Sequence, residues 1–239
     1  MGIYLNLREH QPLKLAARMM LAAFVCLASS VARSESGERV DVRELRPTQA
    51  VAGFKAVDEK AKRLAKLSKS ERLDYLKAHP VPVVIGPKNR LYMIDHHHLA
   101  LAILATGHHH VFVETAADWS GLSERAFWEQ MDEHGYDYLY ANGHEKIEPS
   151  QLPKSILGIK DDPYRSLAYF AREAGAFKKT TTPFSEYSWA DFYRTRISEK
   201  ALRASWDSSV QKAIAISGSS AASNLPGFIK PKSCRVVFQ

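Results

Sequence analysis

The residues best suited to chemistry form the run Asp95-His96-His97-His98, between an apolar strand pattern and an apolar helix pattern. Residues 91–94 are apolar and aromatic, whereas residues 99–105 are apolar on every face, as in a helix covered on all sides. An aspartate here can cap the helix, and the free amides and peptide dipoles of a first helical turn favour an anion. We therefore predict a helix that starts at Asp95, with Asp95, His96, His97 and His98 binding a phosphate.

The histidines also suit proton transfer. An imidazole has an ordinary pKa near 6.5, so His97 or His98 could act as general acid or base on a phosphodiester, with Asp95 beside them. Asp95, His97 and His98 are accordingly the candidate catalytic residues. In the simpler alternative Asp95 only caps the helix and the imidazoles are partly solvated, or the site binds a phosphate ligand without catalysis. The expected partner is a nucleotide, a nucleic acid or another phosphoester, and the sequence points to no particular cofactor.

Several segments resemble one known family, the ParB-like nuclease branch of the ParB/sulfiredoxin superfamily. The resemblance covers roughly residues 40–197 and rests on residues 46–53, the apolar run 81–87, Asp95-His96-His97-His98, and Asp161-Asp162-Pro163-Tyr164-Arg165-Ser166-Leu167-Ala168. It implies an α+β fold: a small mixed sheet with helices, then a mainly helical half. Relatives bind nucleotide phosphates where the strand meets the helix.

That superfamily includes nucleases, CTP-hydrolysing DNA clamps, sulfinic-acid reductases and free serine kinases, so the fold alone does not give the function. A kinase would need a carboxylate base, for which Glu44, Asp58 and Glu59 are equal candidates. A reductase is disfavoured because such enzymes use a cysteine where this chain has histidines. We favour a nuclease or phosphate-ester hydrolase, with the kinase and the phosphate-ligand or nucleic-acid binding module as alternatives.

A second histidine triplet, His108-His109-His110, follows the expected helix. About ten helical residues separate the two triplets by roughly 15 Å, whereas all ligands of one zinc ion lie about 2 Å from the metal. The triplets therefore belong to opposite ends of one helix, and we assign no metal site.

The first 32 residues have the order of a secretory signal peptide. Arg8, Lys14 and Arg18 precede the apolar run 19–28, and small residues follow up to Ala32. The apolar run is too short for a comfortable membrane span, so we expect cleavage after Ala32 and a periplasmic or secreted protein without a transmembrane segment. An exported protein meets little ATP or CTP, which disfavours the kinase and clamp alternatives. The mature chain would keep a net charge of +5, from 30 basic against 25 acidic residues, and Cys234 as its one cysteine.

The remaining patterns divide the mature chain into three parts. Residues 33–118 should form the ParB/sulfiredoxin-like domain, with strands at 81–85, 91–94 and 111–113, an amphipathic helix from Val57, and a helix after the capping-box sequence Ser68-Lys69-Ser70-Glu71. Residues 119–216 should form a helical domain that includes a helix capped by Asp162 with Pro163 in its first turn. Residues 217–239 should form a flexible tail.

Overall fold

A five-stranded mixed sheet lies in the first half of the computed structural model, which describes residues 37–230. Its strands follow the order β1-β6-β4-β5-β2; β1 and β6 pair antiparallel, β6 and β4 parallel, β4 and β5 antiparallel, and β5 and β2 parallel. Two further pairs, β3 with β9 and β7 with β8, lie outside this sheet. The strand bounds are β1 Glu38–Asp41, β2 Arg46–Pro47, β3 Val51–Ala52, β4 Val81–Gly86, β5 Arg90–Met93, β6 His110–Asp118, β7 Tyr140–Ala141, β8 Glu145–Lys146 and β9 Lys160–Asp161.

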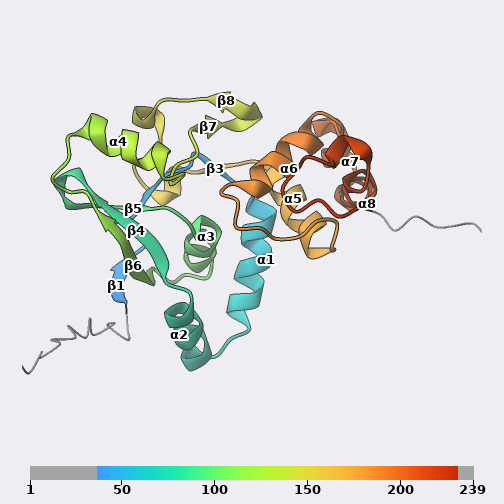
Figure 1. Cartoon of the computed structure of the whole chain (residues 1–239). Coiled ribbons are helices and arrows are strands. Elements are labelled where there is room, and N and C mark those ends of the chain that lie inside the picture. Colours follow the sequence, from blue (N-terminus) through green and yellow to red (C-terminus); the bar gives the residue numbers. More distant parts are fainter. Residues whose placement is uncertain (1–36, 231–239) are drawn as a thin grey trace, which may run out of the picture. The chain divides into compact units, whose positions relative to one another are not determined.

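Eight α-helices accompany the strands in this part of the chain, and α1 lies between α3 and α5 (Figure 1). No helix in residues 37–230 is both long and apolar enough to cross a membrane. The bounds are α1 Phe54–Ala65, α2 Lys69–Ala78, α3 His97–Ala105, α4 Glu124–Glu133, α5 Pro163–Glu173, α6 Ser185–Arg194, α7 Glu199–Ala204 and α8 Trp206–Ser217.

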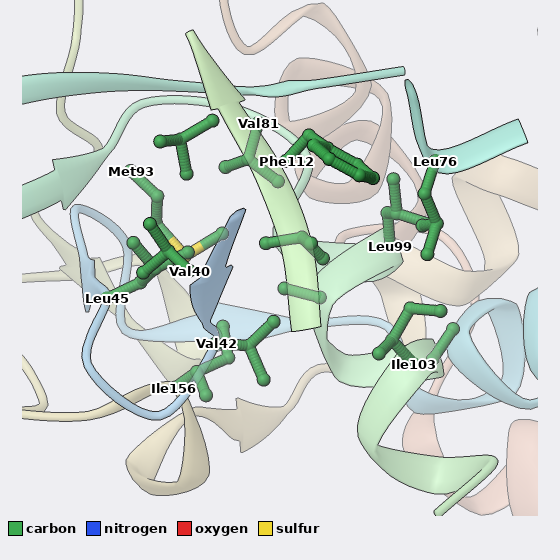
Figure 2. Close-up of a cluster of buried hydrophobic side chains, with 14 of the residues drawn as sticks. Val40, Val42, Leu45, Leu76, Val81, Met93, Leu99, Ile103, Phe112 and Ile156 are labelled. Carbon is green, nitrogen blue, oxygen red and sulfur yellow. The ribbon is translucent and has the colours of Figure 1, made fainter. Parts of the chain in front are cut away.

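Both faces of the sheet are covered by other elements. Neighbouring residues of a strand point to opposite faces of a sheet, and two residues of β4 illustrate this. Val83 of β4 belongs to the main core cluster with Leu99 and Ile103 of α3, and Figure 2 shows these two α3 side chains in that cluster. Val84, the next residue of β4, packs instead with Phe127 of α4. The α+β fold class is therefore confirmed, and α3 is an apolar helix inside the core as predicted. The helix α4, expected in the helical domain, covers the second face of the sheet.

Local signals in the sequence set several of these boundaries. The side chain of Ser68 accepts a hydrogen bond from the Glu71 amide at 3.2 Å, and the Glu71 carboxylate accepts one from the Ser68 amide at 2.8 Å, which completes the predicted capping box of α2. Asp162 caps α5 by accepting from the Tyr164 amide at 3.0 Å, with Pro163 in the first turn. These predictions are confirmed because each depends on residues only two or three positions apart.

The start of α1 has a different kind of cap, supplied by a distant segment. The Phe54 amide donates to Asp161 Oδ1 at 2.8 Å, and the Lys55 amide donates to Ser166 Oγ at 3.1 Å. Gly53, the residue before α1, packs against the backbone of Ser166. Free amides at a helix start need such acceptors. Here α5 and the strand before it provide them, so the two halves of the chain share one set of hydrogen bonds.

The last helices form their own cluster around Trp189 and Tyr193, which are both fully buried. Residues 217–230 pack against this cluster: Ala222 is buried, and the Trp189 indole donates to the Pro226 carbonyl at 2.8 Å. The Gly227 carbonyl is held as well, since it accepts from the Lys178 amide at 2.8 Å. In contrast to the flexible tail expected from residue 217, residues 217–230 are thus fixed by one apolar side chain and two backbone hydrogen bonds. Residues 231–239, with Cys234, and the expected signal peptide at 1–32 lie outside the described residues, and the division at residues 118 and 119 stays a prediction.

Candidate functional site

The turn between β5 and α3 carries the Asp-His-His-His motif, but its cap differs from the prediction. Helix α3 starts at His97 and its N-cap is His96, which has a left-handed backbone with φ 64° and ψ 21°. Asp95 is exposed and accepts from the His96 amide at 2.6 Å, so it holds the turn before the helix. The predicted N-cap at Asp95 is wrong. No side chain of the described residues caps the first turn of α3, so its amides lack a side-chain acceptor.

His97 and His98 point into the protein and act as hydrogen-bond acceptors. His97 is 3% exposed, and its Nε2 accepts from the Thr48 amide at 3.3 Å. His98 Nε2 accepts from the Gly53 amide at 3.2 Å. Both imidazoles must therefore be neutral, with the proton on Nδ1. They attach the segment between β2 and α1 to the start of α3.

Both rings are neutral near pH 7, so neither can act as a general acid there. Burial lowers the pKa of His97 to about 3, and burial together with Arg165 lowers the pKa of His98 well below its ordinary value. A neutral ring whose free nitrogen already accepts a backbone N–H has no lone pair left for a substrate proton. The structure thus gives His97 and His98 a structural role, in contrast to the catalytic role expected from the sequence.

His96 is the histidine of the motif that has an unpaired ring nitrogen. Its ring is half-buried and lines a cavity, and among the described residues its buried Nδ1 has no hydrogen-bond partner. Burial lowers its pKa, although Asp95 acts in the opposite direction, so the ring is neutral near pH 7. Its left-handed backbone is uncommon for a residue other than glycine and occurs preferentially at functional sites.

The cavity beside this turn has a volume of about 780 Å³. We call it the phosphate cavity. Its wall includes the whole motif from Asp95 to Leu99 together with side chains from α1, α5 and the start of α6. Four cationic side chains face two carboxylates, and this excess of positive charge suits an anion. The charged residues are Lys60, Arg165, Arg172, Lys179, Asp95 and Glu186.

Among these side chains, Arg165 gives the strongest indication of an anion site. It is only 7% exposed, yet its hydrogen-bond donors are incompletely paired. It forms an ion pair with Glu186 through Nη2, and its guanidinium carbon lies 4.8 Å from the centre of the Tyr187 ring. In the part of the chain that the structure describes, its buried Nε and Nη1 atoms have no hydrogen-bond partner. Buried donors of a charged group are costly when unpaired. A phosphate oxygen would satisfy them.

Lys60 and Arg172 complete the basic side of the cavity. Arg172 also pairs with Glu186, and the two arginines keep the pKa of that carboxyl low despite its burial. Burial lowers the pKa of Lys60, with Arg63 and Arg172 adding to the shift. A bound anion would offset this repulsion among cations.

None of these cations was predicted as a site residue. Arg165 was noted only as one residue of the segment 161–168. A usable signal was present: Arg165 stands among Tyr164, Ser166 and Leu167, all of which are buried on α5. A buried arginine in a helix needs a partner or a ligand.

The second histidine triplet lies at the other end of α3, as predicted. The helix ends at Ala105, and His110 begins β6. Within residues 37–230, no three His, Cys, Asp or Glu side chains are grouped to hold a metal ion.

The mixed sheet, the flanking helices and the cavity at the strand-to-helix turn define an α+β protein of the ParB/sulfiredoxin type. Residues 38–195 match the family model described as "Putative ParB-like nuclease", and the chain belongs to this family. It is similar to the crystal structure of protein Atu1540 from Agrobacterium tumefaciens, with 38% identity and a TM-score of 0.75 over 82% of this chain and 98% of that chain. A search among curated proteins found no match.

Proposed function

We propose that this protein binds the phosphate of a nucleotide or nucleic acid in the phosphate cavity and hydrolyses a phosphoester there. The observation that carries the proposal is Arg165, a residue of the cavity wall whose buried guanidinium has two unpaired donor atoms. The uncapped first turn of α3 adds backbone amides beside it. Membership of the ParB-like nuclease family favours a phosphodiester as the substrate.

The proposed chemistry gives each residue one role. Arg165, Lys60 and the amides of α3 hold the phosphate and stabilise the charge that develops on its oxygens. A water molecule attacks phosphorus while the neutral ring of His96 accepts its proton at Nδ1, the bond from phosphorus to the ester oxygen breaks, and the leaving oxygen takes a proton from solvent. His97 and His98 keep the turn in place.

Lys60→Met should weaken the binding of inorganic phosphate and nucleotides by about tenfold, because it removes a cation from the cavity wall. Lys62→Met is the matched control, since Lys62 lies on the same helix but is exposed and does not line the cavity. Isothermal titration of the full chain measures both variants.

His96→Gln, assayed with bis(p-nitrophenyl) phosphate, should retain phosphate binding and lose hydrolysis.

Three outcomes would count against parts of this proposal. Equal phosphate affinity in the Lys60 and Lys62 variants would overturn the assignment of the cavity. Full hydrolysis by His96→Gln would remove His96 from the mechanism. Binding without any hydrolysis in the parent protein would leave a phosphate-ligand binding module.

We also propose that the chain is exported, because residues 8–32 have the basic, apolar and small-residue order of a signal peptide. Cell fractionation followed by N-terminal sequencing should find the protein in the periplasm or the medium with Arg33 at its start. Cytoplasmic protein that retains Met1 would contradict export and would restore the case for a kinase that uses cellular nucleotides.

A further inference from the structure

A second cavity, with a volume of about 1,130 Å³, lies next to the phosphate cavity. We call it the ring cavity, because Trp128, Tyr138, Tyr140 and Phe184 contribute to its wall. The two cavities share Gly135 and Phe184 as lining residues. Between these two residues in the chain stands Pro183, which lines the phosphate cavity and would lie 3.5 Å from a Cβ atom at Gly135. Gly135, Pro183 and Phe184 therefore lie where the two cavities adjoin, so that a ligand long enough to pass them would occupy both.

Asp137 is the buried polar group of the ring cavity. It is 8% exposed, and among the described residues its Oδ2 atom has no hydrogen-bond partner. Burial raises its pKa to about 6, and the nearby carboxylate of Asp132 adds to the shift. An unpaired buried carboxylate is unfavourable, and it can only accept hydrogen bonds once ionised. A ligand that fits here must present N–H or O–H donors to it.

Three aromatic residues of the wall are each held by a neighbouring ring. Tyr138 stacks on Tyr187 with ring centres 3.8 Å apart, and Tyr140 stacks on His144 at 4.3 Å. Trp128 packs edge-on against Tyr92 at 5.5 Å. Rings that are already held by neighbours lose little conformational entropy when a flat ligand packs on them.

The charge of the ring cavity differs from that of the phosphate cavity. Five basic and five acidic side chains line it, and one pair of them, Arg125 and Glu129, forms a salt bridge at 2.8 Å. A wall with equal numbers of basic and acidic side chains suits a neutral ligand, whereas the net positive wall of the phosphate cavity suits an anion. A neutral flat ring joined to a phosphate is the chemistry of a nucleotide.

We infer that the ring cavity binds the nucleobase of the ligand whose phosphate occupies the phosphate cavity, with Asp137 accepting hydrogen bonds from the base. This inference rests on the proposed function and specifies its substrate class. Guanine should bind best, because its edge presents two neighbouring N–H donors to one carboxylate. Cytosine and adenine present an amino group beside an acceptor, and uracil presents one N–H between two acceptors, which leaves acceptors facing the carboxylate.

The test compares nucleosides with inorganic phosphate on the full chain. Guanosine should bind more tightly than cytidine, adenosine or uridine in isothermal titration. Asp137→Asn should weaken guanosine binding at least tenfold and leave the affinity for inorganic phosphate unchanged. The matched control is Asp132→Asn, since Asp132 is an exposed carboxylate of the same cavity wall, and it should change guanosine affinity less than twofold.

The possible results separate this inference from the proposed function. Phosphate binding without nucleoside binding in the parent protein, or equal guanosine affinity in the parent and Asp137→Asn, would overturn the base site and leave the phosphate site intact. Guanosine binding that depends on Asp137, without phosphate binding, would support the base site and overturn the phosphate site. Asp137→Asn should fold, because it replaces an unpaired buried carboxylate by a neutral group of the same shape, and circular dichroism checks this.

Discussion

Replacing Gly53 with alanine should destabilise the protein by about 3 kcal/mol or more. A Cβ atom at this position would lie 2.5 Å from the backbone nitrogen of Ser166, 2.6 Å from its Oγ and 2.8 Å from its Cα. Backbone atoms cannot move aside without shifting α5. Any such shift also breaks the cap of α1, because Ser166 Oγ accepts from the Lys55 amide. Urea denaturation followed by circular dichroism measures the loss.

Gly121→Ala is the matched control, because a Cβ atom there meets nothing within 4 Å. Its stability should stay within about 0.5 kcal/mol of the parent value. Ser166→Ala should not rescue the Gly53 variant, since the closest contact is with the backbone and not the hydroxyl. A Gly53→Ala protein as stable as Gly121→Ala would show that α1 and α5 are packed less tightly than the structure indicates.

His97→Ala should lower the free energy of unfolding by about 3 kcal/mol at pH 7, through a cavity in the core and an unpaired amide at Thr48. His96→Ala, a change in the preceding residue, should cost much less, because His96 is half-buried and its Nδ1 has no partner in the described part of the chain. Urea denaturation of both variants gives the comparison. Similar losses in the two would contradict the structural role of His97.

The stability difference should also depend on pH. The pKa of His97 is about 3 in the folded protein and near 6.5 in the unfolded chain, so the unfolded state takes up the proton first. The contribution of His97 is complete above pH 6.5 and is lost as the pH falls toward 3. The gap between the parent and His97→Ala should therefore narrow on acidification. A gap that widens below pH 6 would mean that His97 is protonated in the fold.

Part of the fold could be predicted from the sequence, but the role of His97 could not. The capping residues of α2 and α5 and the apolar strands were predictable, because each depends on residues close together in the chain. The role of His97 was not, because its hydrogen-bond partner Thr48 is 49 positions away. A histidine next to a helix start has the same local sequence whether it faces a ligand or the core. The distinction depends on which distant segment packs against it.

For Arg165, burial could be predicted from the sequence, but the site that it contacts could not. Its buried position on α5 follows from its apolar neighbours, but its orientation toward the start of α3 depends on the packing of α5 beside α1. The motif residues Asp95 to His98 line one cavity, and their binding of a phosphate stays a prediction. The cations that give this cavity its charge come from three other segments and could be placed only with the fold in hand.

The cap that α5 supplies to α1 also has a consequence for the order of events during synthesis. All five strands of the main sheet are complete once Asp118 has been made. The acceptors for the α1 amides arrive only with Asp161 and Ser166, and Ile156 and Ile159 fill places in the core of the sheet. A nascent chain that stops before these residues therefore exposes an incomplete core and uncapped amides. The sheet can reach its final packing only after nearly fifty further residues, from Asp118 to Ser166, have been made.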